Sequence, residues 1–174
     1  MTSPETTDTD SAPVFTVTRT FLAPRELVFR AWTQPEHLAR WMSPAGMTPL
    51  GSRLDLRPGG LFHYGLRTPD GQEMWGKWVF REIEAPSRLV FVSSFSDAAG
   101  GFARHPMAAD WPLETLSTVT FSEQEGRTVL TLTGTPINAS ETERQTFASA
   151  LNGMNQGWAG TFAQLDAYLA EAQS

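Results

Sequence analysis

A long amphipathic stretch near the C-terminus, residues 140–171, reads SETERQTFASALNGMNQGWAGTFAQLDAYLAE. Ser140 and Glu143 have the spacing of a capping box, in which each side chain accepts a hydrogen bond from the other residue's amide, so we expect a helix to begin there. Large apolar residues then recur every three or four positions, which predicts one continuous stripe: Phe147, Leu151, Met154, Trp158, Phe162, Leu165 and Leu169. A single long helix of this kind needs a broad apolar surface to cover.

We expect that surface to be a sheet. Short segments before and beside the helix alternate between apolar and polar residues, as half-buried strands do: residues 14–22, 61–67, 73–84, 89–95, 115–122 and 127–135. Turn sequences such as Pro69-Asp70-Gly71 separate neighbouring segments, and strands joined by short turns are antiparallel. The sequence therefore predicts an α+β fold in which the long helix lies across a curved antiparallel sheet of seven strands.

Two short helices are expected between the first strand and the rest of the sheet. Pro24 and Pro35 each stand where a helix can begin, because the first helical position needs no amide donor. The segments after them place apolar residues on one side: Leu27, Val28, Ala31, Trp32, Leu38, Trp41 and Met42. The two small helices would directly follow the first strand.

Length and composition favour one domain. A chain of 174 residues that is 40% hydrophobic can bury a sizeable core, and we assign that domain to residues 13–174. Residues 1–12 are rich in Thr, Ser, Pro, Asp and Glu, which predicts a disordered tail and no secretory signal. No run of roughly 18 apolar residues occurs, so we expect no membrane-spanning helix.

Charge and cysteine content limit the classes of function. The formal net charge of -6 argues against binding of nucleic acid, where a basic face supplies most of the affinity. The chain has no cysteine, so it carries no disulfide, thiolate nucleophile or cysteine metal site. Nothing here requires an oxidising compartment, and we expect a cytoplasmic protein.

A long connection, residues 96–114, interrupts the series of short turns. Loops of this length in compact domains are usually functional or disordered. In one interpretation it is a flap over the open end of the fold, with Phe102 and Trp111 as its apolar contacts. In the other it is a surface excursion that Trp111 anchors to the core. Composition alone does not separate the two.

The polar residues give little sign of a metal or catalytic centre. His37, His63 and His105 lack the spacing of metal ligands, so we expect no metal and no cofactor. His63 falls on the outward face of its strand, whereas His105, in the long loop, is the histidine nearest the expected cavity mouth. Arg19 and Glu82 fall on inward faces, where they would either orient a polar ligand group or sit at the sheet rim.

Glycines mark two further places. Gly59 and Gly60 follow Pro58 and precede a strand, which is typical of a tight turn with two glycines able to take positive φ rather than of a phosphate-binding loop. Within the long helix, each glycine costs about 1 kcal/mol relative to alanine: Gly153, Gly157 and Gly160. We favour close packing of a neighbouring strand as their reason, with a bend or space for a ligand as alternatives.

Several motifs together resemble a known family. In order they are RTFLAPRELVFRAW at 19–32, PEHLARW at 35–41, DLRPGG at 55–60, Gly76 with Glu82-Ile83 and PSRLV at 86–90, and MNQGW at 154–158. The chain resembles the START-like (SRPBCC) superfamily and, within it, the bacterial homologues of the activator of Hsp90 ATPase. The resemblance implies a helix-grip fold with a cavity for apolar ligands. It also implies, through the family name, a chaperone partner and a stress-response role.

A sheet curved around one helix leaves an interior that large side chains fill only in part, and such concave apolar sites are the usual form of small-molecule sites. Tyr64 and Asn155 are the polar groups expected to orient a ligand. The predicted ligand-binding residues are Trp41, Phe62, Tyr64, Met74, Trp78, Phe80, Phe95, Trp111, Met154, Asn155, Trp158 and Phe162.

The function that we predict is binding of a small hydrophobic or aromatic molecule, without conversion of it. One alternative is an enzyme of the cyclase or hydratase kind on an aromatic or polyketide-like substrate, using His105, Tyr64 or a cavity carboxylate to move a proton. Another is a chaperone ATPase co-regulator. Trp75 and Val90 on outer strand faces would suit a homodimer through an exposed apolar patch, or pack against the small helices, and a monomer fits the sequence equally.

Overall fold

The structure is a computed structural model that describes residues 13–42, 46–105 and 108–173, so the predicted tail, residues 1–12, lies outside the described residues. Within these ranges, seven strands form one antiparallel sheet in the order β1-β7-β6-β5-β4-β3-β2. Their bounds are β1 Phe15–Phe21, β2 Thr48–Leu54, β3 Leu61–Arg67, β4 Glu73–Glu84, β5 Arg88–Ser96, β6 Glu114–Gln124 and β7 Arg127–Ile137. The helices are α2 Arg25–Thr33, α3 Pro35–Trp41, α4 Glu141–Ser149 and α5 Leu151–Ala172.

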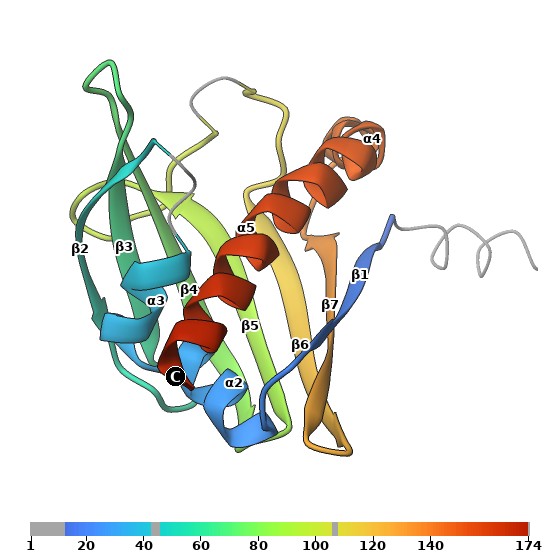
Figure 1. Ribbon diagram of the computed structural model, residues 1–174. Helices are drawn as coiled ribbons and strands as arrows, with labels where there is room; N and C mark the ends of the chain where they lie inside the picture. The colour runs from blue at the N-terminus through green and yellow to red at the C-terminus, as the bar shows by residue number, and fades with distance from the viewer. Residues whose placement is uncertain (1–12, 43–45, 106–107, 174) are drawn as a thin grey trace, which may run out of the picture.

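The sheet curves around α5, which crosses its inner face, and α2 and α3 lie at one end (Figure 1). From β2 to β7 each strand pairs with the next along the chain, and β1 joins the far edge by pairing with β7. The predicted α+β helix-grip architecture, with two short helices after the first strand, is confirmed. Pro35 occupies the start of α3, and Pro24 caps α2 from one position earlier.

The long C-terminal helix begins where predicted but is divided in two. The Ser140 hydroxyl accepts a hydrogen bond from the Glu143 amide at 3.1 Å, and the Glu143 carboxylate accepts one from the Ser140 amide at 2.9 Å. The expectation of one helix is wrong, because Ala150 leaves helical geometry with φ -99° and ψ 3°. Alanine favours helices, so no local signal marks this break. In Figure 1, α4 and α5 differ in direction. Both ends of the apolar stripe are in the core, since Phe147 of α4 and Leu169 of α5 are buried.

A column of aromatic rings crosses the core. Trp158 of α5 stacks on Trp32 of α2 with ring centroids 6.1 Å apart, and Trp32 stacks on Trp78 of β4 at 5.9 Å. Trp78 in turn stacks on Phe91 of β5 at 4.2 Å. Stacked and edge-to-face aromatic pairs each add to the free energy of burial. The column therefore joins the helix layer to the middle of the sheet through one fully buried ring, Trp32.

The second half of α5 is held firmly to its neighbours. Its buried residues are Phe162, Leu165 and Leu169. Asp166 forms an ion pair with Arg19 of β1, so Arg19 does face inward, toward the helix. Tyr168 hydrogen-bonds His37 of α3, and the Glu171 carboxylate accepts from Arg40 at 2.6 Å. In the first half of α5, the large side chains that follow Leu151 are those of Met154 and Trp158, and both are only half-buried.

A β-bulge in β4 overturns the inward placement of Glu82. The pairing of β4 with β5 shifts between Phe80 and Glu82, so the alternation of faces also shifts. Ile83 packs against the core instead, while Glu82 is exposed and pairs with Arg88 at 3.5 Å. A bulge of this kind has no clear signature in one sequence.

In the described part of the chain, Trp75 and Val90 do not form an exposed apolar patch on the outer face of the sheet. Val90 is buried, and the Trp75 ring lies over Gly65 and stacks on His63 with centroids 5.1 Å apart. His63 is on the outer face, as predicted, yet it is only 5% exposed, because residues 97–101 fold over it and the Asp97 carbonyl lies 3.1 Å from its Nε2. The Trp75 ring, His63 and residues 97–101 therefore pack against one another.

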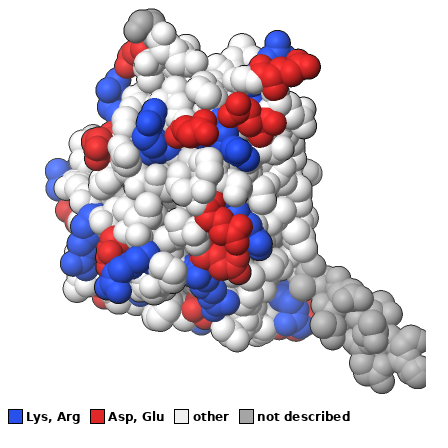
Figure 2. All heavy atoms as spheres, turned by 90° about the horizontal axis from the view of Figure 1, so that it is seen from below, with Lys and Arg blue, Asp and Glu red and all other residues white. Residues whose placement is uncertain are grey.

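Charged side chains of both signs are interspersed on the face seen from below in Figure 2. Several of the described charges form ion pairs close in space, including Arg57 with Asp55 at 2.7 Å and Arg67 with Glu73 at 3.1 Å. The face shown in Figure 2 therefore presents mixed charge rather than a continuous basic surface.

Candidate ligand-binding site

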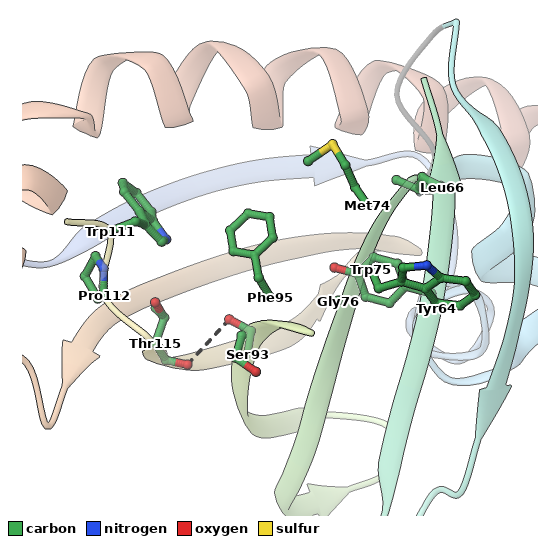
Figure 3. A pocket seen from close by; sticks show the side chains of 11 residues that line it. Tyr64, Leu66, Met74, Trp75, Gly76, Ser93, Phe95, Trp111, Pro112 and Thr115 are labelled. Carbon is green, nitrogen blue, oxygen red and sulfur yellow. Dashed lines mark hydrogen bonds between the residues drawn. The ribbon is translucent and has the colours of Figure 1, made fainter. Parts of the chain in front are cut away.

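Two adjoining cavities lie inside the curve of the sheet. The first, of about 250 Å³, opens on β3, β4 and β5, with α5 passing above it (Figure 3). The second, of about 160 Å³, reaches under α5, where Met154 and Trp158 form part of its wall. The two cavities share Ser93, Trp111 and Thr115, so they are neighbours. The interior beneath the first half of α5 is therefore partly hollow.

Many of the predicted ligand-binding residues line these cavities. Those in the wall of the first are Tyr64, Met74, Phe95 and Trp111. Those in the wall of the second are Trp78, Trp111, Met154 and Trp158. Phe62 lies beside a third hollow of only about 60 Å³ between α3 and the strands β2 and β3, which Tyr64 also lines.

Other predicted residues lie elsewhere. Trp41, Phe80 and Phe162 are 0–1% exposed within the core and line none of these cavities. The Trp41 indole Nε1 donates to the Ala31 carbonyl at 2.8 Å, which fixes that ring as a structural element. Asn155 is exposed and lines none of these cavities, so it is not placed to orient a ligand there. Periodicity identified the inner face, but it does not tell which inner rings leave space beside them.

Sequence reasoning missed the small polar residues of the wall. Ser93 lies between Phe91 and Phe95 on the inner face of β5, and its hydroxyl donates to the Thr115 carbonyl at 3.5 Å (Figure 3). The available signal was the interruption of an apolar alternation by a serine. Thr115 and Leu66 were missed for a different reason, since only the three-dimensional register places them beside the same space.

Tyr64 lies flat on the sheet because its partner on the next strand is glycine. Tyr64 pairs with Gly76 across β3 and β4, and a Cβ atom at Gly76 would lie 2.5 Å from the Tyr64 hydroxyl oxygen. On the outer face, the adjacent cross-strand pair has its glycine on β3 and its aromatic residue on β4, so the Trp75 ring lies over Gly65. Burial raises the pKa of Tyr64 to about 12, so its hydroxyl stays protonated at neutral pH and can donate a hydrogen bond.

The walls of both cavities are uncharged. None of the described residues that line either one is Asp, Glu, Lys, Arg or His. His105 stands just behind the wall, with its ring 4.7 Å from that of Phe95 and 6.1 Å from that of Trp111. Burial lowers the pKa of His105, which favours the neutral imidazole at pH 7. The site can therefore provide hydroxyl donors and apolar surface to a bound molecule.

Comparison with known proteins assigns the family. The model of the family described as Activator of Hsp90 ATPase homolog 1-like protein matches residues 22–170. The chain belongs to this family. Its fold is similar to a solved structure from Arthrobacter aurescens, with 31% identity, a TM-score of 0.73 and coverage of 92% of this chain and 87% of that one. No curated protein sequence matches the chain.

Two further solved structures are similar to this member of the Activator of Hsp90 ATPase homolog 1-like family. One, from Mycobacterium smegmatis, has 28% identity, a TM-score of 0.72 and coverage of 90% of both chains. The other, from Nitrosomonas europaea, has 23% identity, a TM-score of 0.73 and coverage of 92% of this chain and 96% of that one. At that identity the likeness concerns the fold.

In this family member, different parts of the long connection lie on the inner and on the outer face of the sheet. Trp111 lines both cavities and packs on Phe147 of α4 with centroids 5.4 Å apart. Phe102, in contrast, is 53% exposed and lies on the outer face, where the Lys77 ammonium sits 4.0 Å from its ring centre. The interpretation in which Phe102 is an apolar contact of a flap over the cavity is therefore not supported. Within the described part of the connection, Trp111 and Pro112 contribute to the site.

The described residues offer no group of three or more His, Asp or Glu side chains close enough to hold a metal ion. Each of the three histidines has different contacts: His37 hydrogen-bonds Tyr168, His63 hydrogen-bonds the Asp97 carbonyl, and His105 packs on aromatic rings. Within the same described ranges, no helix is long and apolar enough to cross a bilayer.

The glycines of α5 face open space, so close packing of a strand is not their reason. A Cβ atom at Gly153, Gly157 or Gly160 would meet nothing within 4 Å. We expect Gly157→Ala to raise the free energy of unfolding by about 0.5–1 kcal/mol, because alanine favours the helix and nothing obstructs its methyl group. Differential scanning calorimetry should show a Tm higher by about 1–4 °C.

Gly126→Ala is the matched control. Its Cβ would also meet nothing within 4 Å, but Gly126 has φ +79°, which disfavours any residue with a side chain. That substitution should lower Tm. An equal response of the two variants would contradict the explanation.

Proposed function

We propose that this protein binds a small hydrophobic or aromatic molecule in the two adjoining cavities beneath α5. The observation that carries the proposal is the hollow, uncharged interior between α5 and the inner face of β3, β4 and β5. Small-molecule sites are typically concave and apolar with a few polar groups. Here the apolar part is supplied by rings such as Phe95 and Trp111, and the polar part by Tyr64, Ser93 and Thr115.

The anchoring of α5 favours a route into this space. Its second half is tied to β1 and α3 by ion pairs and buried side chains, whereas Met154 and Trp158 in the first half are only partly buried. Segments with few buried contacts open at a lower free-energy cost than the core does. A ligand would therefore enter beside the first half of α5 without unfolding of the sheet.

Thermal unfolding in the presence of a library of small aromatic and aliphatic molecules tests the proposal. A ligand that binds only the folded protein adds about 2.7 kcal/mol of stability at a free concentration of one hundred times Kd. For a chain of this size that corresponds to a rise in Tm of roughly 5–10 °C. No rise with any member of the library would contradict the proposal.

A pair of variants on neighbouring strands links such a rise to the cavities. Ser93→Leu adds apolar volume where the two cavities meet, and it should abolish the ligand-induced rise in Tm. Thr120→Leu on β6 is the control, because Thr120 is exposed and lines neither cavity. If both variants respond to ligand as the unaltered protein does, the ligand binds elsewhere.

The proposal states binding without conversion, and the same mixtures test this part. Mass spectrometry of the ligand after prolonged incubation should find it unchanged. A new product whose formation requires the protein would favour the cyclase or hydratase alternative, for which His105 beside Phe95 remains the candidate proton acceptor. The chaperone partnership, the homodimer and the cytoplasmic location stay predictions of the sequence.

A further inference from the structure

We propose that the cavity selects neutral aromatic molecules that carry a hydrogen-bond acceptor, and that the Tyr64 hydroxyl recognises this acceptor. This inference rests on the proposed function and narrows it to one class of ligand. It excludes anions such as fatty acids and aromatic carboxylates, which otherwise have the same apolar character.

The absence of charge from the described wall is the first step. A buried anion costs several kcal/mol unless a cation or several donors face it. A cation close to the wall is Arg104, whose guanidinium donates to the Trp111 carbonyl at 3.1 Å. The same guanidinium is already paired with the Glu143 carboxylate at 2.5 Å. The described walls themselves therefore offer no positive charge to an anionic ligand, and Arg104 is already engaged.

Tyr64 is the second step. Its ring stacks on Phe62 with centroids 5.0 Å apart and lies over Gly76, so its position is fixed. In Figure 3 its hydroxyl points along the cavity toward Phe95. No hydrogen bond joins that hydroxyl to another residue that the structure describes, and the hydroxyl is accessible from the cavity rather than sealed in the core. A ligand that brings a carbonyl or ether oxygen to this point can accept its hydrogen bond in place of water.

Ser93 and Thr115 contribute their hydroxyls at the opposite end of the wall. Ser93 donates to the Thr115 carbonyl, and both residues lie on the far side of Phe95 from Tyr64 (Figure 3). Burial also raises the pKa of the Tyr64 phenol, so this group remains a hydrogen-bond donor at every pH near neutrality. A planar ring held between Phe95 and Met74 would place one substituent at Tyr64.

Three probes with one skeleton test the inference: acetylnaphthalene, ethylnaphthalene and naphthoate, each substituted at the same ring carbon. The first is neutral with an acceptor, the second is neutral without one, and the third is an anion at neutral pH. By titration calorimetry we expect acetylnaphthalene to bind about tenfold more tightly than ethylnaphthalene, the effect of one hydrogen bond to a buried donor. Naphthoate should bind at least about a hundredfold more weakly than acetylnaphthalene.

Tyr64→Phe should lower the affinity for acetylnaphthalene about tenfold and leave that for ethylnaphthalene unchanged, which also reports that the variant is folded. Tyr168→Phe is the control, because it removes the other tyrosine hydroxyl, which hydrogen-bonds His37 outside the cavity. This control should leave the preference for the ketone intact.

The outcomes separate this inference from the proposed function. Equal binding of the ketone and the alkyl probe, or a preference that survives Tyr64→Phe, overturns the role of Tyr64. Naphthoate binding as tightly as the ketone overturns the selection of neutral ligands. If these three probes fail while other members of the library bind, the ligand class is wrong and hydrophobic binding stands. If nothing binds, both proposals fall.

Discussion

Trp32→Ala is expected to lower the free energy of unfolding by about 4 kcal/mol, the largest loss that we predict for any single substitution in this protein. The Trp32 side chain is 0% exposed and contacts four other aromatic rings: Trp41, Trp78, Phe121 and Trp158. Removing this side chain leaves a cavity where α2, α5 and the sheet meet. Urea denaturation followed by circular dichroism should show a lower midpoint with an unchanged slope.

Two control variants separate this loss from a general effect of removing an indole. Trp32→Phe should cost only about 1–2 kcal/mol, because it keeps an apolar ring. It also removes the Trp32 Nε1 donor, which is buried without a partner among the described residues. Trp75→Ala, on the outer face, should likewise cost less than Trp32→Ala. If Trp32→Ala proves no more harmful than Trp75→Ala, the aromatic column is not the centre of the core.

The sequence predicted best what depends on one chain segment at a time. Alternation located the strands and the inward faces of β3, β4 and β5, so Tyr64 and Met74 were found. The capping box located the helix start at Ser140. The break at Ala150 was missed, since the residue there favours a helix and the cause lies in what α4 and α5 pack against.

The site was predictable only in part for the same reason. Ser93 and Gly76 matter through their partners on neighbouring strands, Thr115 and Tyr64. Register of this kind is a property of two segments, and a one-residue shift such as the bulge before Glu82 reverses every side chain after it. Asn155 shows the same limit on a helix. We predicted that this polar residue lines the cavity, but it lies on the exposed side of α5.

Gly60→Ala is expected to lower the free energy of unfolding by about 3 kcal/mol, because the new methyl group has no room. A Cβ atom at Gly60 would lie 2.1 Å from the backbone oxygen of Asp55. Relief requires the turn to move, yet the Gly60 carbonyl accepts from the Phe80 amide at 2.9 Å and the Gly60 amide donates to Arg57 at 2.8 Å. Chemical denaturation measures the loss.

The neighbouring glycine gives the matched comparison. Both glycines are able to adopt positive φ, but of the two only Gly59 does, at +83°, and a Cβ there would meet nothing within 4 Å. Gly59→Ala should therefore cost about 1 kcal/mol, from backbone conformation alone. The two substitutions add the same atom one residue apart, so a clearly larger loss at Gly60 isolates the steric contact with Asp55. Equal losses would mean that the turn relaxes freely, and that its pairing with Phe80 does not fix the start of β3.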